Sequence, residues 1–98
     1  NNGLQIDGKV SDVMNTMPYD TKLRAFGWNT IEIDGHDIDE ILSAFKCAKE
    51  LKGAPTAIIA KTVKGMGVSF MENQAGWHGK APNEEQVQQA IEELGGEW

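Results

Sequence analysis

The clearest periodic pattern lies in the middle of the chain and predicts an amphipathic helix. Its apolar residues recur at intervals of three and four positions, which places them on one stripe of a helix: Ile38, Ile41, Leu42, Phe45, Ala48 and Leu51. Asp37 begins a capping-box variant with Glu40, three residues later. Gly53 has the place of the glycine that commonly ends a helix.

Two short segments beside this helix predict strands. The run from Trp28 to Ile33 alternates along its length, and the run from Thr56 to Ala60 is short and continuously apolar. A continuous apolar run is expected in a parallel sheet that is covered on both faces. Strand, helix of about fourteen residues and strand make a βαβ unit, so the chain is expected to be α/β. Two strands are few for a self-sufficient domain, and we expect the other strands of the sheet to lie elsewhere.

Weaker patterns predict further helices. A first turn ends at Pro18, with Ser11 and Asp12 able to cap it and with apolar residues at helical spacing: Val10, Val13, Met14 and Met17. A second short helix is expected between an Asp20 cap and Gly27. The last helix is expected from an Asn83 cap to Gly95, with Glu84 and Glu85 in its first turn. Residues 1–8 and 61–82 are expected to be polar, glycine-bearing loops.

Composition and charge exclude several classes of protein. The formal net charge of −6 argues against a nucleic-acid binder, because phosphate neutralisation needs a basic face. Cys47 is the single cysteine, so the chain has no internal disulfide and no cysteine-rich zinc site, and its neighbours suggest a thiol packed on a helix. No apolar run reaches the ~18 residues of a membrane span, and no leader precedes a cleavage site. We therefore expect a soluble, cytoplasmic protein, and the start at Asn1 without Met suggests a fragment.

Two loops have residues that can approach a ligand closely. In residues 1–8, the side-chain amide of Asn2 and the backbone carbonyl of Leu4 are hard oxygen ligands suited to Mg²⁺ or Ca²⁺. The alternative is a plain turn, which Asn-Asn-Gly commonly forms. In the second loop, Gly65 and Gly67 allow either a ligand to approach the backbone or a sharp bend.

A third loop, around residues 75–82, contains a histidine that can bind a ligand or transfer a proton. His78 lies between Trp77 and Gly79 in a long loop, and loops often carry functional residues. Its imidazole can donate to a phosphate or exchange protons near neutral pH. His36 lies in the turn before the central helix and is expected to be structural. Helix capping and a solvated face explain the acidic residues of that turn, with Ca²⁺ binding as a weaker alternative: Asp34, Asp37, Asp39 and Glu40.

Taken in order, these segments resemble the transketolase family. Residues 1–8 resemble the second half of the thiamine diphosphate motif, and their Ile6-Asp7-Gly8 ending is typical of transketolases. Further matching segments follow in the family's order: Phe26-Gly27-Trp28, Asp34-Gly35-His36-Asp37, Lys61-Thr62-Val63-Lys64-Gly65-Met66-Gly67 and Trp77-His78-Gly79-Lys80-Ala81-Pro82. The resemblance covers residues 1–98, as a C-terminal portion of the diphosphate-binding domain. It is greatest for the separate N-terminal subunit of transketolases encoded as two chains.

The resemblance implies a role for each matching residue. Asn2, through its amide oxygen, and Leu4, through its carbonyl, would bind the divalent metal that bridges the cofactor's diphosphate. Ile6 would pack near the cofactor rings. His78 would lie beside the diphosphate and the reacting ketol, as a catalytic and cofactor-binding residue. Thiamine diphosphate would supply the carbanion chemistry, and the protein would orient and polarise the reactants.

The resemblance also implies partners and an activity. The full enzyme would move a two-carbon ketol unit between sugar phosphates of the pentose phosphate pathway, as an oligomer completed by a pyrimidine-binding domain or subunit. The family's Gly-Asp-Gly, with the second metal-binding side chain, and its upstream histidines do not occur in these residues. The glutamate that activates the cofactor belongs to the pyrimidine-binding domain. We therefore expect the 98 residues alone to be inactive.

Two alternatives stay open. One is another thiamine diphosphate enzyme such as 1-deoxyxylulose-5-phosphate synthase, although Trp77-His78-Gly79 argues against it. The other is a truncated interaction module that folds, for example as a dimer, but binds no cofactor. In that case the open sheet edges would be covered by another copy or chain.

Overall fold

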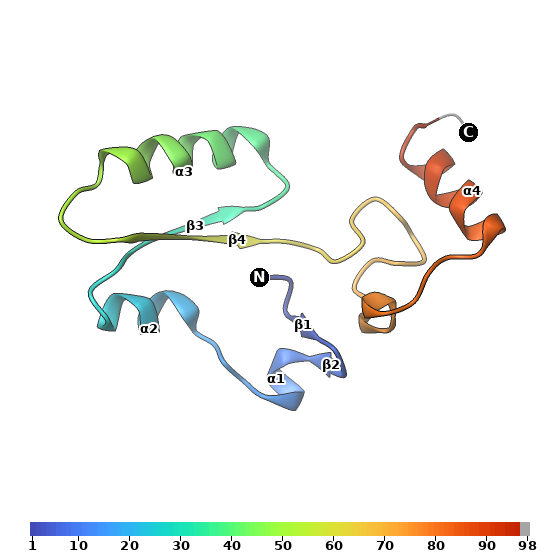
Figure 1. Ribbon diagram of the computed structural model, residues 1–98, viewed down its shortest axis with the longest axis horizontal. Helices are drawn as coiled ribbons and strands as arrows, with labels where there is room; N and C mark the ends of the chain where they lie inside the picture. The colour runs from blue at the N-terminus through green and yellow to red at the C-terminus, as the bar shows by residue number, and fades with distance from the viewer. Residues whose placement is uncertain (97–98) are drawn as a thin grey trace. The chain divides into compact units, whose positions relative to one another are not determined.

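The computed structural model describes residues 1–96, in two compact units (Figure 1). Unit 1 comprises Asn1 and Asn15–Thr62, and unit 2 comprises Asn2–Met14 and the residues from Val63 onward. The elements follow one another as β1 (Leu4–Gln5), β2 (Gly8–Lys9), α1 (Val10–Val13), α2 (Tyr19–Ala25), β3 (Asn29–Asp34), α3 (Ile38–Glu50), β4 (Thr56–Lys61), the 3₁₀ helix η1 (Ala75–His78) and α4 (Glu84–Glu93).

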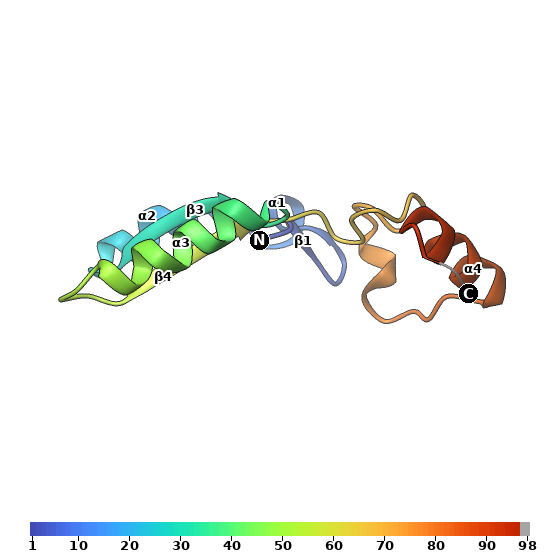
Figure 2. The ribbon, with the colours of Figure 1, turned by 90° about the horizontal axis from the view of Figure 1, so that it is seen from above.

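Unit 1 contains the predicted βαβ unit. β3 and β4 pair in parallel, in register from Asn29 opposite Thr56 to Asp34 opposite Lys61, and α3 connects them. Figure 1 shows α3 on one side of the strands and α2 on the other, and both helices contact both strands. Seen from above, α3 lies along the length of the strands (Figure 2). The α/β prediction is therefore confirmed, and so is the cover on both faces of the sheet.

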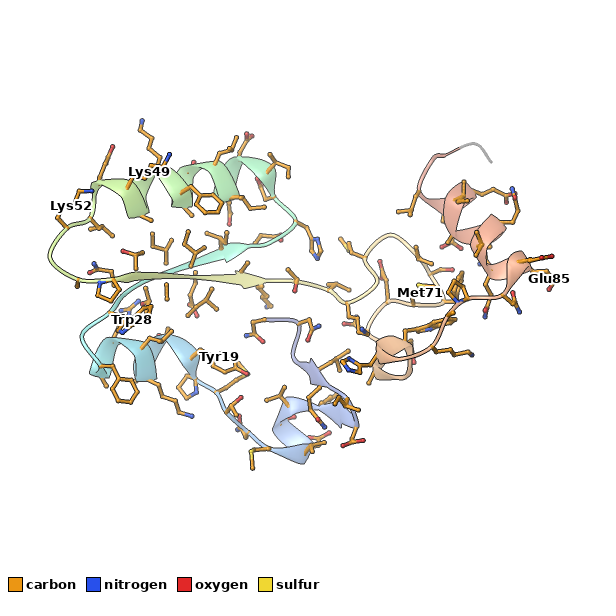
Figure 3. All side chains as sticks on the ribbon, viewed as in Figure 1. Tyr19, Trp28, Lys49, Lys52, Met71 and Glu85 are labelled. Atoms are coloured by element: carbon orange, nitrogen blue, oxygen red, sulfur yellow. The ribbon has the colours of Figure 1, made fainter. Side chains whose placement is uncertain are left out.

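The strand and helix boundaries in unit 1 differ from the predictions by small shifts. β3 begins one residue later than predicted because the amide of Trp28 donates to the carbonyl of Leu23, in the turn that follows α2. Figure 3 shows Trp28 at this junction of α2 and β3, and Tyr19 at the start of α2. The Asp20 cap was wrong: α2 begins at Tyr19, directly after the extended backbone of Pro18, so Asp20 already lies in the first turn.

The caps of α3 agree in part with the prediction. The Asp37 carboxylate accepts from the amides of Asp39 and Glu40, at 2.9 and 3.1 Å. The Glu40 carboxylate accepts from the amide of Asp34 at 2.7 Å instead of returning to Asp37, so the capping box is only half formed. The helix is capped at Leu51, which places Gly53, with φ of +88°, one residue later than predicted.

The apolar stripe of α3 is divided between two surfaces. Ala44 is buried, and Ile41 and Ala48 are half-buried. Ile38, Leu42 and Phe45 are exposed, by 66%, 62% and 57% of their surface. Cys47 is also exposed, so the predicted packed thiol was wrong: its position on α3 lies beside a surface groove and not in the core.

Unit 2 begins with a structure that the loop prediction missed. Within the predicted loop, β1 pairs with β2 in an antiparallel hairpin in which Leu4 faces Lys9 and Gln5 faces Gly8, closed by a two-residue turn. The helix predicted up to Pro18 is a single turn, α1, and only its Val10 is buried. The backbone is extended from Met14, whose side chain is 73% exposed and offers no packing to continue a helix. The N-cap residue of α1 is Lys9, whose side chain makes no capping hydrogen bond, so the predicted caps Ser11 and Asp12 do not cap this helix.

The predicted last helix is confirmed as α4, together with its cap. The Asn83 side chain accepts from the amide of Gln86 at 2.9 Å, and the Gln86 side chain accepts from the amide of Asn83 at 3.0 Å. This reciprocal capping box satisfies two backbone donors that a helix start otherwise leaves unpaired. The helix ends at Glu93, shortly before Gly95 with its φ of +72°.

Within unit 2, Glu93 ties α4 to the preceding loop. Its carboxylate accepts from the hydroxyl and the backbone amide of Ser69 and from the side-chain amide of Gln89. The hydrogen bond from the Ser69 hydroxyl, followed by the one from its amide, lowers the pKa of Glu93 below its usual 4.5. The attachment is therefore complete above pH 4.5 and is lost as the pH falls through the lowered pKa of the folded state.

We expect the NMR chemical shift of the Ser69 amide to change as the pH falls below about 4.5, because protonation of Glu93 removes a charged acceptor. Glu93→Gln should abolish that titration. Glu92→Gln is the matched control, since the Glu92 carboxylate accepts from Gln88 on the same helix and not from Ser69. A Ser69 titration that persists in Glu93→Gln would contradict the assignment.

Candidate functional site

All four residues predicted for the site lie in unit 2. Asn2, Leu4 and Ile6 belong to the N-terminal hairpin, and His78 is the last residue of η1. The strand β2 of this hairpin contacts η1. The structure thus brings the segment that carries His78 against the hairpin, although more than 60 residues separate them in the sequence.

Asn2 and Leu4 present their oxygens on one edge of the hairpin. Asn2 Oδ1 accepts from the amide of Leu4 at 2.9 Å. The Val10 amide donates to the Gly3 carbonyl, so Gly3 and Val10 form a hydrogen-bonded pair of the ladder. In an antiparallel ladder the next pair, Leu4 and Lys9, is not hydrogen-bonded, and the Leu4 amide and carbonyl face away from β2.

The two oxygens are suited to a hard cation. Because Leu4 directs both its backbone groups to the same edge, its carbonyl lies on the side where the Asn2 amide oxygen is held. An amide oxygen has two lone pairs, and the Leu4 amide occupies one of them. One neutral side-chain oxygen and one carbonyl oxygen are ligands that Mg²⁺ and Ca²⁺ accept, with further ligands needed to fill the coordination sphere.

Ile6 lies in the two-residue turn of the hairpin. Its side chain is 62% exposed, an unusual position for a large apolar residue in a tight turn. The turn places this side chain two residues beyond Leu4 on the chain, so an apolar surface and the two oxygens belong to the same short hairpin. Such a surface can pack against a flat apolar ring.

His78 is exposed at the end of η1. Within residues 1–96 its imidazole has no hydrogen-bond partner, so both ring nitrogens are available to a ligand. The residue before it is fixed: the Trp77 indole N–H donates to the Phe70 carbonyl at 3.0 Å, and the Lys80 ammonium lies 4.8 Å from the centre of the indole ring. The site thus combines a free imidazole with an ordered backbone.

The glycine pair of the second loop forms a sharp bend. The Val68 amide donates to the Gly65 carbonyl, and the Gly67 amide donates to the Glu72 carboxylate at 2.9 Å. A Cβ at Gly65, whose φ is +73°, would lie 2.6–2.7 Å from Met71 atoms. Figure 3 shows Met71 in this loop between β4 and η1. The close approach that Gly65 allows is therefore to the loop's own backbone.

Two residues of unit 2 were missed by the sequence analysis. Gln5 Nε2 is buried without a hydrogen-bond partner in the described part of the chain, which leaves an unsatisfied donor in the hairpin. No pattern in the sequence distinguishes this glutamine. Trp77 was named only as part of the motif around His78, with no role of its own, whereas its contacts with Phe70 and Lys80 organise the loop. Its partners are local, but the sequence does not reveal that they meet.

The acidic turn of unit 1 is a capping structure. The carboxylates of Asp34, Asp37 and Glu40 accept from backbone amides of the same turn. Asp37 and Glu40 border a groove of about 470 Å³ between β3 and α3. Among residues 1–96 no cluster of three or more His, Cys, Asp or Glu side chains could hold a metal ion, so the Ca²⁺ hypothesis for this turn finds no ligand set.

No helix within residues 1–96 is long and apolar enough to cross a membrane.

Comparison with known proteins identifies a family. Residues 1–98 match the family model described as transketolase, thiamine diphosphate binding domain. The chain is 42% identical, over 93 residues, to the 6-deoxy-6-sulfo-D-fructose transketolase subunit SqwG of Clostridium sp. strain MSTE9; the match covers 95% of this chain and 34% of that subunit. It is 45% identical over 76 residues to the transketolase of Mus musculus, covering 78% of this chain and 12% of that protein.

The structural comparison agrees. A crystal structure of transketolase from Campylobacter jejuni superposes with a TM-score of 0.89 at 31% sequence identity, over 99% of this chain and 15% of that one. The chain thus spans about a third or less of the length of the relatives that it matches.

Proposed function

Because the chain belongs to the family of transketolase thiamine diphosphate-binding domains, we propose that it supplies the metal-binding and histidine-bearing part of a ketol-transferring enzyme. The observation that carries the proposal is the shared edge of Asn2 and Leu4 in the hairpin that contacts the segment of His78. The enzyme would move a two-carbon ketol unit between sugar phosphates, and a pyrimidine-binding domain or subunit would complete it. An oligomeric state and a cytoplasmic location stay predictions.

The donor set fits the divalent metal of such a site. Asn2 Oδ1 and the Leu4 carbonyl would each provide one oxygen to Mg²⁺ or Ca²⁺, and the remaining ligands would come from the diphosphate, from water and from other parts of the enzyme. Both oxygens are neutral, so neither of them offsets the positive charge of the metal that attracts the diphosphate. The unsatisfied Gln5 Nε2–H group is a hydrogen-bond donor in the same hairpin and not a metal ligand.

The other two residues would bind the cofactor and the reactants. The exposed Ile6 would pack against the cofactor rings, where its apolar surface becomes buried. The free His78 imidazole would donate a hydrogen bond to the diphosphate, or accept or return a proton at the oxygen of the reacting ketol. Thiamine diphosphate supplies carbanion stabilisation when bound, and this chain's residues hold and orient it.

A chimera tests the proposal most directly. The 98 residues would replace the matching segment of the C. jejuni transketolase, which provides the rest of the site. We expect ketol transfer that requires thiamine diphosphate and Mg²⁺. An inactive but folded chimera would contradict the proposal and favour the alternative of a module that binds no cofactor.

In that chimera, Asn2→Ala should weaken Mg²⁺-dependent binding of thiamine diphosphate by roughly 10–100-fold, because one of few metal ligands is lost. The affinity is measured by calorimetry at fixed Mg²⁺. Asn15→Ala is the matched control: the Asn15 side chain accepts from the amide of Met17 at 3.1 Å, in the same local turn geometry as Asn2 with Leu4. Equal effects of the two variants would mean that Asn2 acts only through its turn.

A further inference from the structure

We infer that Trp77 is a positioning residue for His78, through an indole that anchors the end of η1. The inference rests on the proposed function of His78 and concerns the residue that keeps its imidazole in place. His78 itself has no hydrogen-bond partner within residues 1–96, so its own side chain does not fix its orientation. Its placement depends on the backbone on which it stands.

Three contacts hold the Trp77 side chain. The indole N–H donates to the Phe70 carbonyl at 3.0 Å, in a half-buried environment. The indole and the Phe70 ring pack with their centres 5.5 Å apart and their planes inclined by 60°. The Lys80 ammonium lies 4.8 Å from the centre of the indole ring, within the range of a cation–π interaction. A polar bond and two ring contacts therefore hold one side chain in one orientation.

These contacts act on His78 through the short helix that contains both residues. η1 is only four residues long and has no side-chain cap, so it has little stability of its own. Trp77 connects it to Phe70 before the helix and to Lys80 after it. In the sequence, His78 lies between Trp77 and Lys80, the two residues that form the cation–π contact. Loss of the indole therefore removes the side-chain contacts that hold the end of η1, and the imidazole can leave the position that the proposed function requires.

A double-mutant cycle in the C. jejuni chimera separates this role from general stability. The variants are Trp77→Leu, His78→Ala and their combination, with kcat and KM measured at saturating thiamine diphosphate and Mg²⁺. We expect Trp77→Leu to lower kcat about tenfold or more when His78 is present, with less than about a twofold change in KM. In the His78→Ala background, Trp77→Leu should change kcat by less than about twofold, because the group that it positions is already missing.

The outcomes distinguish the inference from the function on which it rests. If His78→Ala leaves kcat unchanged, the proposed role of His78 is wrong, and the inference fails with it. If His78→Ala lowers kcat but Trp77→Leu does not, or if Trp77→Leu lowers kcat equally in both backgrounds, the role of His78 stands and the positioning role of Trp77 is overturned.

Two further variants test whether a loss of activity comes from misfolding. Trp77→Phe keeps an aromatic ring for the contacts with Phe70 and Lys80 but removes the indole N–H. The kcat of Trp77→Phe should lie between those of the parent and of Trp77→Leu. If Trp77→Leu does not fold, the double-mutant cycle can be repeated with Trp77→Phe. Trp28→Phe, at a partly exposed tryptophan of unit 1, is the control and should leave kcat and KM within about twofold of the parent. A Trp77→Phe variant as active as the parent would show that the N–H is dispensable and overturn the anchoring bond.

Discussion

Replacing His78 by alanine is expected to lower the kcat of the chimeric transketolase roughly 10²–10⁴-fold, the usual contribution of a general acid–base group. His78 is exposed, and within the described residues its ring nitrogens have no partner, so its replacement removes chemistry without breaking a contact that supports the fold. The measurement is steady-state ketol transfer between sugar phosphates, together with cofactor affinity. Unchanged affinity with a lower kcat would place His78 at the reacting ketol, and a loss of both would place it also at the diphosphate.

The second histidine provides the control. His36 lies in the turn before α3, in unit 1, where its amide donates to the Asp34 carboxylate at 2.9 Å. Its backbone bond survives substitution of the side chain, so His36→Ala should leave kcat within about twofold of the parent. Equal losses of activity in the two variants would contradict a specific role for His78.

Gly65→Ala is expected to destabilise unit 2 by roughly 2–4 kcal/mol, since it combines left-handed strain with overpacking. The φ of Gly65 is +73°, and an added Cβ would lie 2.6 Å from the Met71 Cβ and 2.7 Å from its backbone carbonyl atoms. A backbone cannot move aside as the end of a flexible side chain can. Urea unfolding followed by tryptophan fluorescence reports the loss, with Trp77 in unit 2 and Trp28 in unit 1 among the reporters.

Substitutions at two other glycines separate the effect of left-handed strain from that of overpacking. Gly53 has a φ of +88° but open space around its missing Cβ, so Gly53→Ala measures the strain alone, about 1–2 kcal/mol. Gly76 has open space and no left-handed φ, so Gly76→Ala should change stability by less than about 0.5 kcal/mol. If Gly65→Ala costs no more than Gly53→Ala, the contact with Met71 does not constrain the loop.

The predictions for local structure succeeded where a strong local signal had tertiary support. The βαβ unit and α4 have apolar periodicity and side-chain caps, and all of their elements formed within one or two residues of their predicted bounds. The helix predicted up to Pro18 had the spacing but nothing to pack on beyond Val10, and it ended after one turn. Periodicity predicts a helix, but burial of its apolar face supplies most of its stability.

The candidate site was predicted residue by residue through the family resemblance. Asn2, Leu4, Ile6 and His78 were named from motifs, and their metal, cofactor and catalytic roles remain predictions. The sequence did not reveal that Asn2 and Leu4 share a strand edge, because the hairpin depends on pairing with Gly8 and Lys9 and has almost no periodic signal. It did not single out Trp77 either, since the partner of its N–H is a backbone carbonyl, which every residue possesses.

The sequence by itself determined the α/β class, the N-caps of α3 and α4 at Asp37 and Asn83, and the motifs that place the chain in its family. These features depend on residues a few positions apart, whose interactions are dictated by local backbone geometry. Only the tertiary structure decided that the glycine pair serves a bend, that most of the α3 stripe stays exposed, and that η1 meets the N-terminal hairpin. The packing of α3 and the contact of η1 with the hairpin depend on segments distant in sequence, and such contacts form only when the chain folds back on itself. The bend depends on the contact of Gly65 with Met71, six residues later, which the sequence does not show.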